Sequence, residues 1–596
     1  QLMTWTGQKV LTGQQTLPAG ALVNGANSIV IEPINAAGLL NNDWTMWFDW
    51  LDLTYPYSGA YLADALFNNP DAGTWRYQIT QSPSATPWVL NVANPASPKL
   101  LTNFSATGLG GAYTLTWQQA TTASDRFVVT PDSAVRTPVA VKVYTDPGLL
   151  ATNQQVDYLI IGHASLLPSV QPLANERANV DGYSVKVVDV QDVYDAFSDG
   201  SVSAEAIRSY LTYVYNSYQW PAPAFVLLAG DGTVDPRNYQ LSLYGHQNLV
   251  PPYVGGYDAW GGTSISDNAM AFIQGNDLLG EMIVSRLRVN SPAEAQVVVN
   301  KTLNYAADFP PDRAMSTLWV TDNPDNDNPL YGTQFYMAAD ETITELLPAF
   351  AVDKMYFCVA GVNNCPADPA YYTDLTAARA AIQTKISQGH SLLYYSGHGS
   401  FTTWGHEQLF RSYPNWVDPL TNGPALPFLL VSSCTNGFFA DARYNGIDEV
   451  LLRTGGKGTI GGFTGVTFDT VPPQTHLLKE FVHVAMHEGI TQTGVAAAVA
   501  RGRSYAELPY PENQRTAVGH GLTGDPALAL VQPPPCIEGD LDCDGDIDIV
   551  DVQLVAAAWN TQAWQSGYNP RADLVLNGRI EVNDIQAAAA LWQTLP

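Results

Sequence analysis

The pattern of hydrophobic and polar positions changes near residue 155. Before that point, short segments of alternating hydrophobic and polar residues are separated by turn residues, as at 44–53, 113–117 and 126–130. Such spacing without a helical period is typical of antiparallel sheets packed face to face. We therefore predict an N-terminal all-β sandwich or jelly roll over residues 1–152.

Beyond residue 155 the pattern predicts alternating strands and helices. Uninterrupted apolar runs predict strands at 157–161, 184–188, 224–231, 317–321, 391–396, 427–432 and 459–463. Helical periodicity marks 166–180, 204–218 and 333–347. Apolar strands between helices are what a parallel sheet covered on both faces requires. We expect an α/β catalytic domain with mostly parallel sheets in two subdomains, 153–315 and 316–532.

The run of three prolines at 533–535 predicts a stiff linker, so we place a separate small α-helical module at 533–596. A chain of 596 residues is also too long for one core. The expected fold class is therefore multidomain.

Charge and apolar content narrow the class of protein further. Acids outnumber bases 56 to 27, and the net charge of −29 argues against a nucleic-acid partner, whose phosphates need a basic surface. No apolar stretch reaches the length of about 18 residues that a membrane span needs. No glycine-rich phosphate loop follows a strand, so we expect no organic cofactor.

The five cysteines indicate in which cellular compartment the protein functions. Cys358 and Cys365 lie seven residues apart, as do Cys536 and Cys543, and both spacings suit a small local disulfide. Disulfides indicate an oxidising compartment, and a chain that begins at Gln1 is expected to have lost a signal peptide. We expect a secreted protein, extracellular or associated with the cell surface.

This pairing leaves Cys434 alone, directly after the apolar run 428–432. His398 has the same setting, because it follows the apolar run 391–396. Neighbouring parallel strands would bring both residues to one sheet edge, where open α/β sheets keep their active sites. A thiol beside an imidazole is a candidate nucleophile, and the N–H groups of Gly399 and Cys434 are candidates for an oxyanion hole. Asp322, just beyond strand 317–321, is a candidate to orient the imidazole.

Two alternatives stay open at this point. In the first, Cys434 is a buried structural cysteine and His398 is a turn residue. In the second, His406 replaces His398 as the base. His406 lies in a loop without the strand-end setting.

These residues carry a resemblance to a known family. The segments 395–400 with Trp404, and 429–434, are similar to the gingipain family of caspase-like cysteine peptidases. Further similar segments lie at 157–161, 207–208, 226–231, 281–286, 446–450 and 522–528. The resemblance implies a cysteine endopeptidase with Cys434 as nucleophile, His398 as general base and acid, and Asp322 as the acidic third member. The immunoglobulin-like domain that follows the catalytic unit in gingipains is replaced here by a different module.

The substrate pocket is less well marked. In gingipains an acidic residue of the enzyme binds the basic side chain that precedes the scissile bond of the substrate. The matching position of this sequence falls near 334–336, which contains no acidic residue. Asp325, Asp327 and Trp404 are the candidates for the pocket. An acidic loop that is solvated or binds calcium is the alternative for the two aspartates.

The C-terminal module contains a calcium-loop pattern at 540–551. Acids at loop positions 1, 3, 5 and 12, with Gly545 at position 6, follow the EF-hand spacing, and the expected ligands are Asp540, Asp542, Asp544, Asp546 and Asp551. A second copy at 573–584 has Val575 where an oxygen ligand belongs, so we expect a weaker site. Its expected ligands are Asp573, Asn577, Arg579 and Asp584.

Two such loops, each followed by one helix, resemble dockerin modules. The resemblance implies a calcium-stabilised docking tail with a cohesin-like protein partner. The rival hypothesis for the whole chain is a catalytically idle extracellular structural or adhesive protein assembled through this tail.

His483 and His487 stand one helical turn apart, as in a zinc pair. Val484 occupies the position where zinc peptidases carry their general-base glutamate. We therefore expect no metal at this histidine pair.

Overall fold

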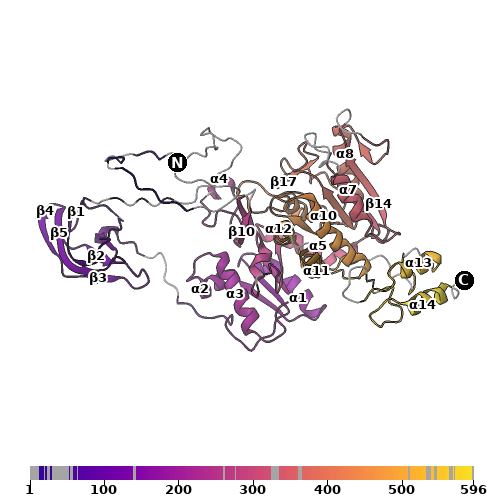
Figure 1. Cartoon of the computed structure of the whole chain (residues 1–596), viewed down its shortest axis with the longest axis horizontal. Coiled ribbons are helices and arrows are strands. Elements are labelled where there is room, and N and C mark those ends of the chain that lie inside the picture. The colour runs from indigo at the N-terminus through magenta and orange to yellow at the C-terminus, as the bar shows by residue number, and fades with distance from the viewer. Residues whose placement is uncertain are drawn as a thin grey trace. The chain divides into compact units, whose positions relative to one another are not determined.

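The chain forms two compact units, one spanning Leu17–Val143 and the other mainly Tyr144–Pro596 (Figure 1). The computed structural model describes 65–137, 143–239, 241–258, 262–275, 277–323, 334–359, 365–507, 511–531, 538–542, 546–562 and 571–592, with shorter stretches before 64 and at 568–569.

The first unit contains two antiparallel three-stranded sheets. One has the order β1-β5-β4 and the other β3-β2-β6. The bounds are Gly73–Ser82, Trp88–Asn91, Lys99–Leu101, Ser105–Leu109, Ala112–Thr121 and Phe127–Thr130 for β1 to β6. Both sheets contribute side chains to one core, which includes Trp117 of β5 and Phe127 of β6. The predicted segment 44–53 lies largely outside the described residues, so the complete sandwich stays a prediction.

The second unit is organised around one continuous sheet of eleven strands, with the order β15-β14-β13-β16-β20-β21-β22-β12-β9-β7-β8. The strands at one end are β7 to β9 and β12, namely Tyr158–Gly162, Val185–Asp189, Phe225–Ala229 and Ile283–Leu287. Those at the other end are β13 to β16, β20 and β21, namely Ser316–Thr321, Ala351–Phe357, Tyr371–Tyr372, Leu392–Ser396, Phe428–Ser432 and Gly461–Gly465. The two predicted α/β units therefore share a single sheet.

Strand β22 (His520–Thr523) joins the two halves and reverses the direction of the sheet. It pairs antiparallel with β21 and parallel with β12. The carboxyl ends of β7, β9 and β12 therefore lie at the edge opposite to the carboxyl ends of β13, β16 and β20. Only the half that contains β13, β16 and β20 has the carboxyl ends of its strands at the edge that carries Cys434.

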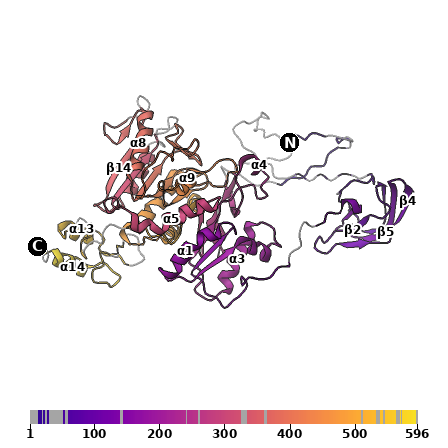
Figure 2. The ribbon, with the colours of Figure 1, turned by 180° about the vertical axis from the view of Figure 1, so that it is seen from behind.

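Helices cover both faces of the sheet, as the fully buried strands β7, β9, β16, β20 and β21 require (Figures 1 and 2). In the half that contains β20, α7 (Gln334–Ile343), α10 (Val471–His487) and α11 (Thr493–Glu507) share one core. On the opposite face, α8 (Leu375–Gln388) and α9 (Ile447–Arg453) share another. The other half is covered by α1 (Leu167–Asn179) and α5 (Pro292–Asp308) on one face, and by α2 (Val190–Phe197) and α3 (Ala204–Ser217) on the other.

Shorter elements complete this unit. They are α4 (Leu241–Tyr244), α12 (Pro511–Gly519), a β10–β11 hairpin (Val254–Asp258 and Gly262–Ile265), and a small sheet of β17 (Gly399–Ser400), β18 (Thr403–Trp404) and β19 (Phe410–Arg411). None of the helices in the described ranges is long and apolar enough to span a bilayer.

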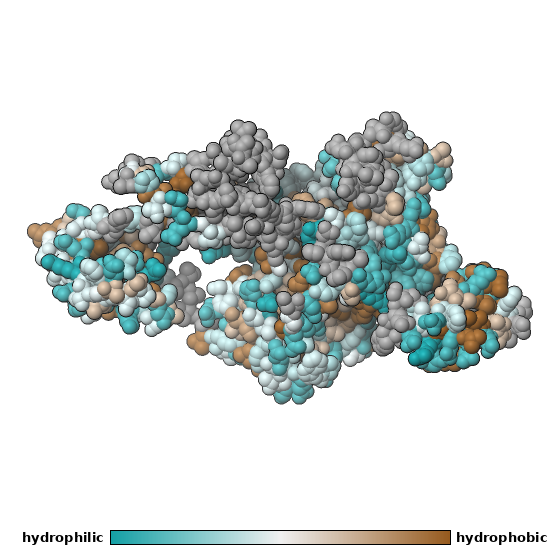
Figure 3. Space-filling model, in the orientation of Figure 1, coloured by the Kyte–Doolittle hydropathy of each residue, from teal (hydrophilic) through white to brown (hydrophobic). Residues whose placement is uncertain are grey.

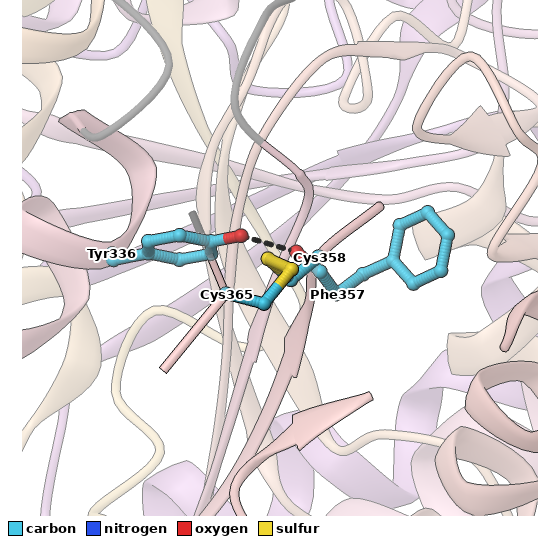
Figure 4. The surroundings of a disulfide bond; sticks show 4 residues. All are labelled: Tyr336, Phe357, Cys358 and Cys365. Carbon is cyan, nitrogen blue, oxygen red and sulfur yellow. Dashed lines mark hydrogen bonds between the residues drawn. A yellow bond between two sulfur atoms is a disulfide. The ribbon is translucent and has the colours of Figure 1, made fainter. Parts of the chain in front are cut away.

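A disulfide joins Cys358 and Cys365 directly after β14 (Figure 4). Beside it, the hydroxyl of Tyr336 in α7 donates a hydrogen bond to the carbonyl of Phe357. The end of β14 is thus attached both to α7 and to its own following segment. Cys536 and Cys543, the other predicted pair, lie outside the described residues.

The C-terminal segment contains α13 (Ile549–Ala557) and α14 (Val582–Trp592), which pack on each other. Their small core contains Leu541, Val555, Ile580 and Ala588. Ile547, at loop position 8, is buried as the calcium-loop pattern requires.

A buried ion pair between Arg177 of α1 and Asp525 connects the half of the sheet that contains β7 to the turn after β22. Asp525 accepts hydrogen bonds from Tyr158 at 2.7 Å and from the Nε of Arg177 at 2.9 Å. Asp525 is only 2 % exposed, so its removal leaves the buried guanidinium of Arg177 without this partner.

We predict that Asp525→Ala lowers the free energy of unfolding by about 3–5 kcal/mol. Asp181→Ala removes the more exposed partner of the same arginine and should cost less than about 1 kcal/mol. Differential scanning calorimetry of the main transition measures both. Equal effects of the two substitutions would contradict the assigned role of Asp525.

Candidate functional site

Three neighbouring strands end in register at one edge of the sheet. Thr321 of β13 pairs with Ser396 of β16, and Ser396 pairs with Ser432 of β20. His398 and Cys434 each follow two residues after a paired serine, so they leave the sheet at the same level. Adjacent strands lie about 4.8 Å apart. The structure therefore brings together the two strand ends that the sequence singles out.

Backbone hydrogen bonds extend the pairing beyond the strands. The N–H of Asp322 donates to the carbonyl of Ser396 at 3.0 Å, and the N–H of Gly397 donates to the carbonyl of Ser432 at 3.2 Å. The residues that carry the candidate chemistry thus begin on a common rigid edge.

The backbone of His398 is held from both sides. Its N–H donates to Oδ2 of Asp322 at 3.1 Å. Its carbonyl accepts from the hydroxyl of Tyr395 at 2.5 Å and from the N–H of Gly405 at 2.8 Å. Burial, and next the charge of Asp322, raise the pKa of the Tyr395 phenol, so it remains a proton donor. Asp322 is itself 1 % exposed and acts on His398 through the main chain.

Two rings frame the imidazole of His398. The ring of His406 stacks on it, with centroids 4.5 Å apart and planes 8° from parallel. The ring of Phe335, in the first turn of α7, meets it edge-on at 5.2 Å. Neither contact was expected from the sequence, because both residues lie outside the strand-end motifs.

Cys434 begins a tight turn after β20. The next residue, Thr435, has a φ of 50°, which is rare for a β-branched side chain. The thiol of Cys434 donates to the backbone carbonyl of Asp469 at 3.4 Å. Asp469 is fixed in turn by Arg515, whose Nη2 lies 3.0 Å from its carboxylate. The segment after β21 thus forms a further wall beside the sulfur, which the sequence motifs did not indicate.

The turn after Cys434 and the hairpin after His398 are in direct contact. A Cβ atom on Gly399 would lie 2.5 Å from Oγ of Ser433 and 2.8 Å from Nδ2 of Asn436. The same amide of Asn436 donates to the carbonyl of Ser400, and to that of Thr403 at 3.2 Å. Only a glycine fits between the two segments, so Gly399 permits their close approach.

Trp404 is not placed at a pocket. Its side chain is fully buried, stacks on Tyr395 with ring centroids 4.5 Å apart and packs against Phe410. The prediction that Trp404 lines the substrate pocket is therefore wrong, because the ring fills the core beneath the hairpin. Asp325 and Asp327, the other pocket candidates, lie outside the described residues.

The first calcium loop brings three buried carboxylates together. One oxygen from each of Asp540, Asp542 and Asp551 lies within 4.8 Å of the others. Asp551 also accepts from the N–H groups of Leu541 at 2.6 Å and Asp548 at 2.8 Å, which fixes its orientation. Clustered carboxylate oxygens are the ligands that a hard divalent cation such as calcium prefers. Asp546 lies near Asp548 and Asp551 in a second group, and Asp544 lies outside the described residues.

The second loop is organised by its own N–H groups. Asp573 accepts from Asn577 at 3.0 Å and from Gly578 at 2.7 Å. Asp584 accepts from Val575 and from Glu581, both at 2.9 Å. The N–H groups around Asp584 repeat the pattern around Asp551 in the first loop. The weaker second site therefore stays a prediction that rests on Val575.

The comparisons with known proteins concern the α/β unit. The family model of peptidase family C25 matches residues 151–531. Gingipain R2 of Porphyromonas gingivalis is 26% identical over 211 residues, which cover 35% of this chain and 26% of that protein. Gingipain R1 of Porphyromonas gingivalis is 26% identical over 211 residues, covering 35% of this chain and 19% of the relative. The match thus spans about a quarter or less of the curated relatives.

The solved structures give the same fold. The crystal structure of the Arg-specific cysteine proteinase gingipain R aligns with a TM-score of 0.50 and 18% identity, covering 67% of this chain and 82% of that one. This likeness confirms the predicted gingipain-like fold with a large α/β sheet. Since the family model also matches more than half of the sequence, the chain belongs to peptidase family C25.

Proposed function

We propose that the chain is a secreted cysteine endopeptidase that hydrolyses peptide bonds with Cys434 as nucleophile and His398 as general base and acid. The observation that carries the proposal is the common register of Thr321, Ser396 and Ser432, which starts both catalytic segments at the same level. Membership of peptidase family C25 supports the same reaction class, with protein or peptide substrates.

In the proposed reaction the thiolate of Cys434 attacks the carbonyl carbon of the scissile bond. The imidazolium of His398 then protonates the leaving amine, and an acyl-enzyme remains. His398 next removes a proton from water, which attacks the acyl carbon and releases the second product. Asp322 keeps His398 in place through its main-chain N–H, so we describe it as a positioning residue.

The N–H groups of Gly399 and Cys434 are the proposed donors to the oxyanion. Each follows closely on a rigid strand end, which limits how far the donors move during the reaction. Donors that are already aligned cost no reorganisation when charge develops on the substrate oxygen.

The rival function is a catalytically idle structural or adhesive protein. The common register of the segments that carry His398 and Cys434, together with membership of peptidase family C25, favours the peptidase. A chemical test of the thiol separates the two hypotheses.

We predict that a peptidyl acyloxymethyl ketone labels Cys434 in the calcium-loaded, reduced chain. His398→Ala should slow labelling and peptide hydrolysis by roughly 100-fold or more, the range of general acid–base catalysis. His406→Ala is the matched control, since it removes the exposed imidazole that stacks on His398, and its effect should be much smaller. Mass spectrometry of the labelled peptide gives the rates. An unlabelled Cys434, or a larger effect of His406→Ala, would support the rival hypotheses.

A second prediction concerns the contact between the two catalytic segments. Gly399→Ala places a methyl group against Ser433 and Asn436 and should displace the His398 hairpin. A misplacement of about 1 Å costs on the order of 100-fold in rate. Gly502→Ala in α11 is the control, since no atom lies within 4 Å of its added Cβ. Hydrolysis rates unchanged by Gly399→Ala would show that the hairpin does not act in catalysis.

We propose that residues 536–596 form a dockerin-like, calcium-stabilised docking tail with a cohesin-like protein partner. Apolar side chains gather on the surface of this segment (Figure 3). They include Ile549, Val550, Trp559, Val582 and Trp592, each more than a third exposed. An exposed apolar group of this kind is typical of an interaction surface.

The segment carries two arginines and ten acids, a net charge of −8, so loss of calcium should loosen it. We predict that a chelator accelerates tryptic cleavage after Arg571 and Arg579 at least about tenfold in a Cys434→Ala background, where self-cleavage is absent. Asp551→Asn should reproduce this effect in the presence of calcium, and Asp584→Asn should do so less. Cleavage rates that do not depend on chelator would refute the calcium assignment.

A further inference from the structure

Outside the catalytic edge, two histidines and a glutamate from different parts of the chain converge beside α10. His483 and His487 lie one turn apart at the carboxyl end of this helix. Glu345 lies just after α7, 138 residues earlier. Its Oε2 is 2.8 Å from Nδ1 of His483 and 3.9 Å from Nε2 of His487. Sequence alone supplies the histidine pair but not this third group.

The spacing is close to that of a metal centre. One ligand atom from each residue lies within 4.8 Å of the others. Zinc bonds of about 2.1 Å in a tetrahedron place ligand atoms about 3.4 Å apart. Shifts of about 1 Å would therefore bring the three side chains into coordination, and all three are already partly buried with side-chain exposures of 18–22%.

The surroundings fit a bound cation. Oε1 of Glu488 lies 3.6 Å from Nε2 of His483, where it is placed to accept the ring N–H that does not bind the metal. Carboxylates in this position fix the orientation of metal-binding histidines. Glu488 is itself held by Arg503, whose Nη2 lies 2.9 Å away. Lys479, 3.7 Å from Oε1 of Glu345, faces the oxygen that is not needed for coordination.

The donor set selects the metal. Two imidazole nitrogens and one carboxylate suit zinc and similar divalent transition metals, whereas calcium takes oxygen ligands alone. Three protein ligands leave a fourth position for water. Val484 stands where a zinc peptidase has its general base, so the centre lacks the group needed to activate that water for peptide hydrolysis.

We propose that Glu345, His483 and His487 form a structural binding site for zinc or a similar divalent transition metal, which fastens the end of α7 to α10. The site has no part in the peptidase proposal above. Its consequence for that site is mechanical, because Phe335 in the first turn of α7 contacts the ring of His398. A metal bound near the other end of α7 would hold this helix in place, and with it the contact of Phe335 with the His398 ring.

The test uses the full chain with Cys434→Ala, which removes the thiol as a competing zinc ligand, in buffer with excess calcium. Isothermal titration with zinc should show one site, and cobalt should give the visible absorption of a four-coordinate centre. Zinc should also raise the unfolding temperature. His487→Ala and Glu345→Gln should each weaken binding at least about tenfold and abolish the temperature shift.

His476→Ala is the matched control. His476 lies on the same helix, with Nε2 3.4 Å from Glu507 in a separate group, and its loss should leave zinc affinity unchanged. Unfolding temperatures measured without metal identify any variant that fails to fold, and the remaining variant of the pair then decides. Absence of zinc binding, binding that survives both ligand substitutions, or an equal loss in His476→Ala would overturn the proposal.

Discussion

Everything at the edge that carries the candidate active site depends on the register between three parallel strands. Thr321, Ser396 and Ser432 stand side by side in β13, β16 and β20, so the residues that follow them emerge together. A slip of one residue would turn each side chain to the opposite face of the sheet. The strands are fully buried between two layers of helices, and their apolar side chains on both faces oppose such a slip.

The rigid edge is then extended mainly through the main chain. Asp322 binds the N–H of His398, Tyr395 binds its carbonyl, and Asn436 bridges to the hairpin through two carbonyls. These contacts fix the course of the segments that carry His398 and Cys434, and Gly399 allows the two segments to touch. The half of the sheet that contains β7 and β9 has its carboxyl ends at the opposite edge. It supports the half that contains β16 and β20 through β22 and the buried pair of Arg177 and Asp525.

Sequence reasoning located the features that depend on short segments. Unbroken apolar runs marked the strands, and the repeated setting of His398 and Cys434 placed both at strand ends. The pattern at 540–551 likewise anticipated the convergence of Asp540, Asp542 and Asp551.

Features that depend on distant partners were missed. The antiparallel pairing of β22 merges two expected sheets into one, and nothing within residues 520–523 signals its neighbours. Trp404 was a candidate for the substrate pocket, yet its ring fills the core under Tyr395. The stacking of His406 on His398 and the approach of Glu345 to His483 likewise join segments that no local pattern relates.

We propose that the sulfur of Cys434 and the imidazole of His398 act on the same peptide carbonyl. A crystal structure of the calcium-loaded chain after reaction with a peptidyl acyloxymethyl ketone tests it directly. We expect a thioether at Cys434, with the His398 imidazole within direct or single-water hydrogen-bonding reach of the sulfur. The inhibitor oxygen should lie near the N–H of Gly399. An unmodified Cys434, or an imidazole beyond that reach in the inhibited state, would contradict it.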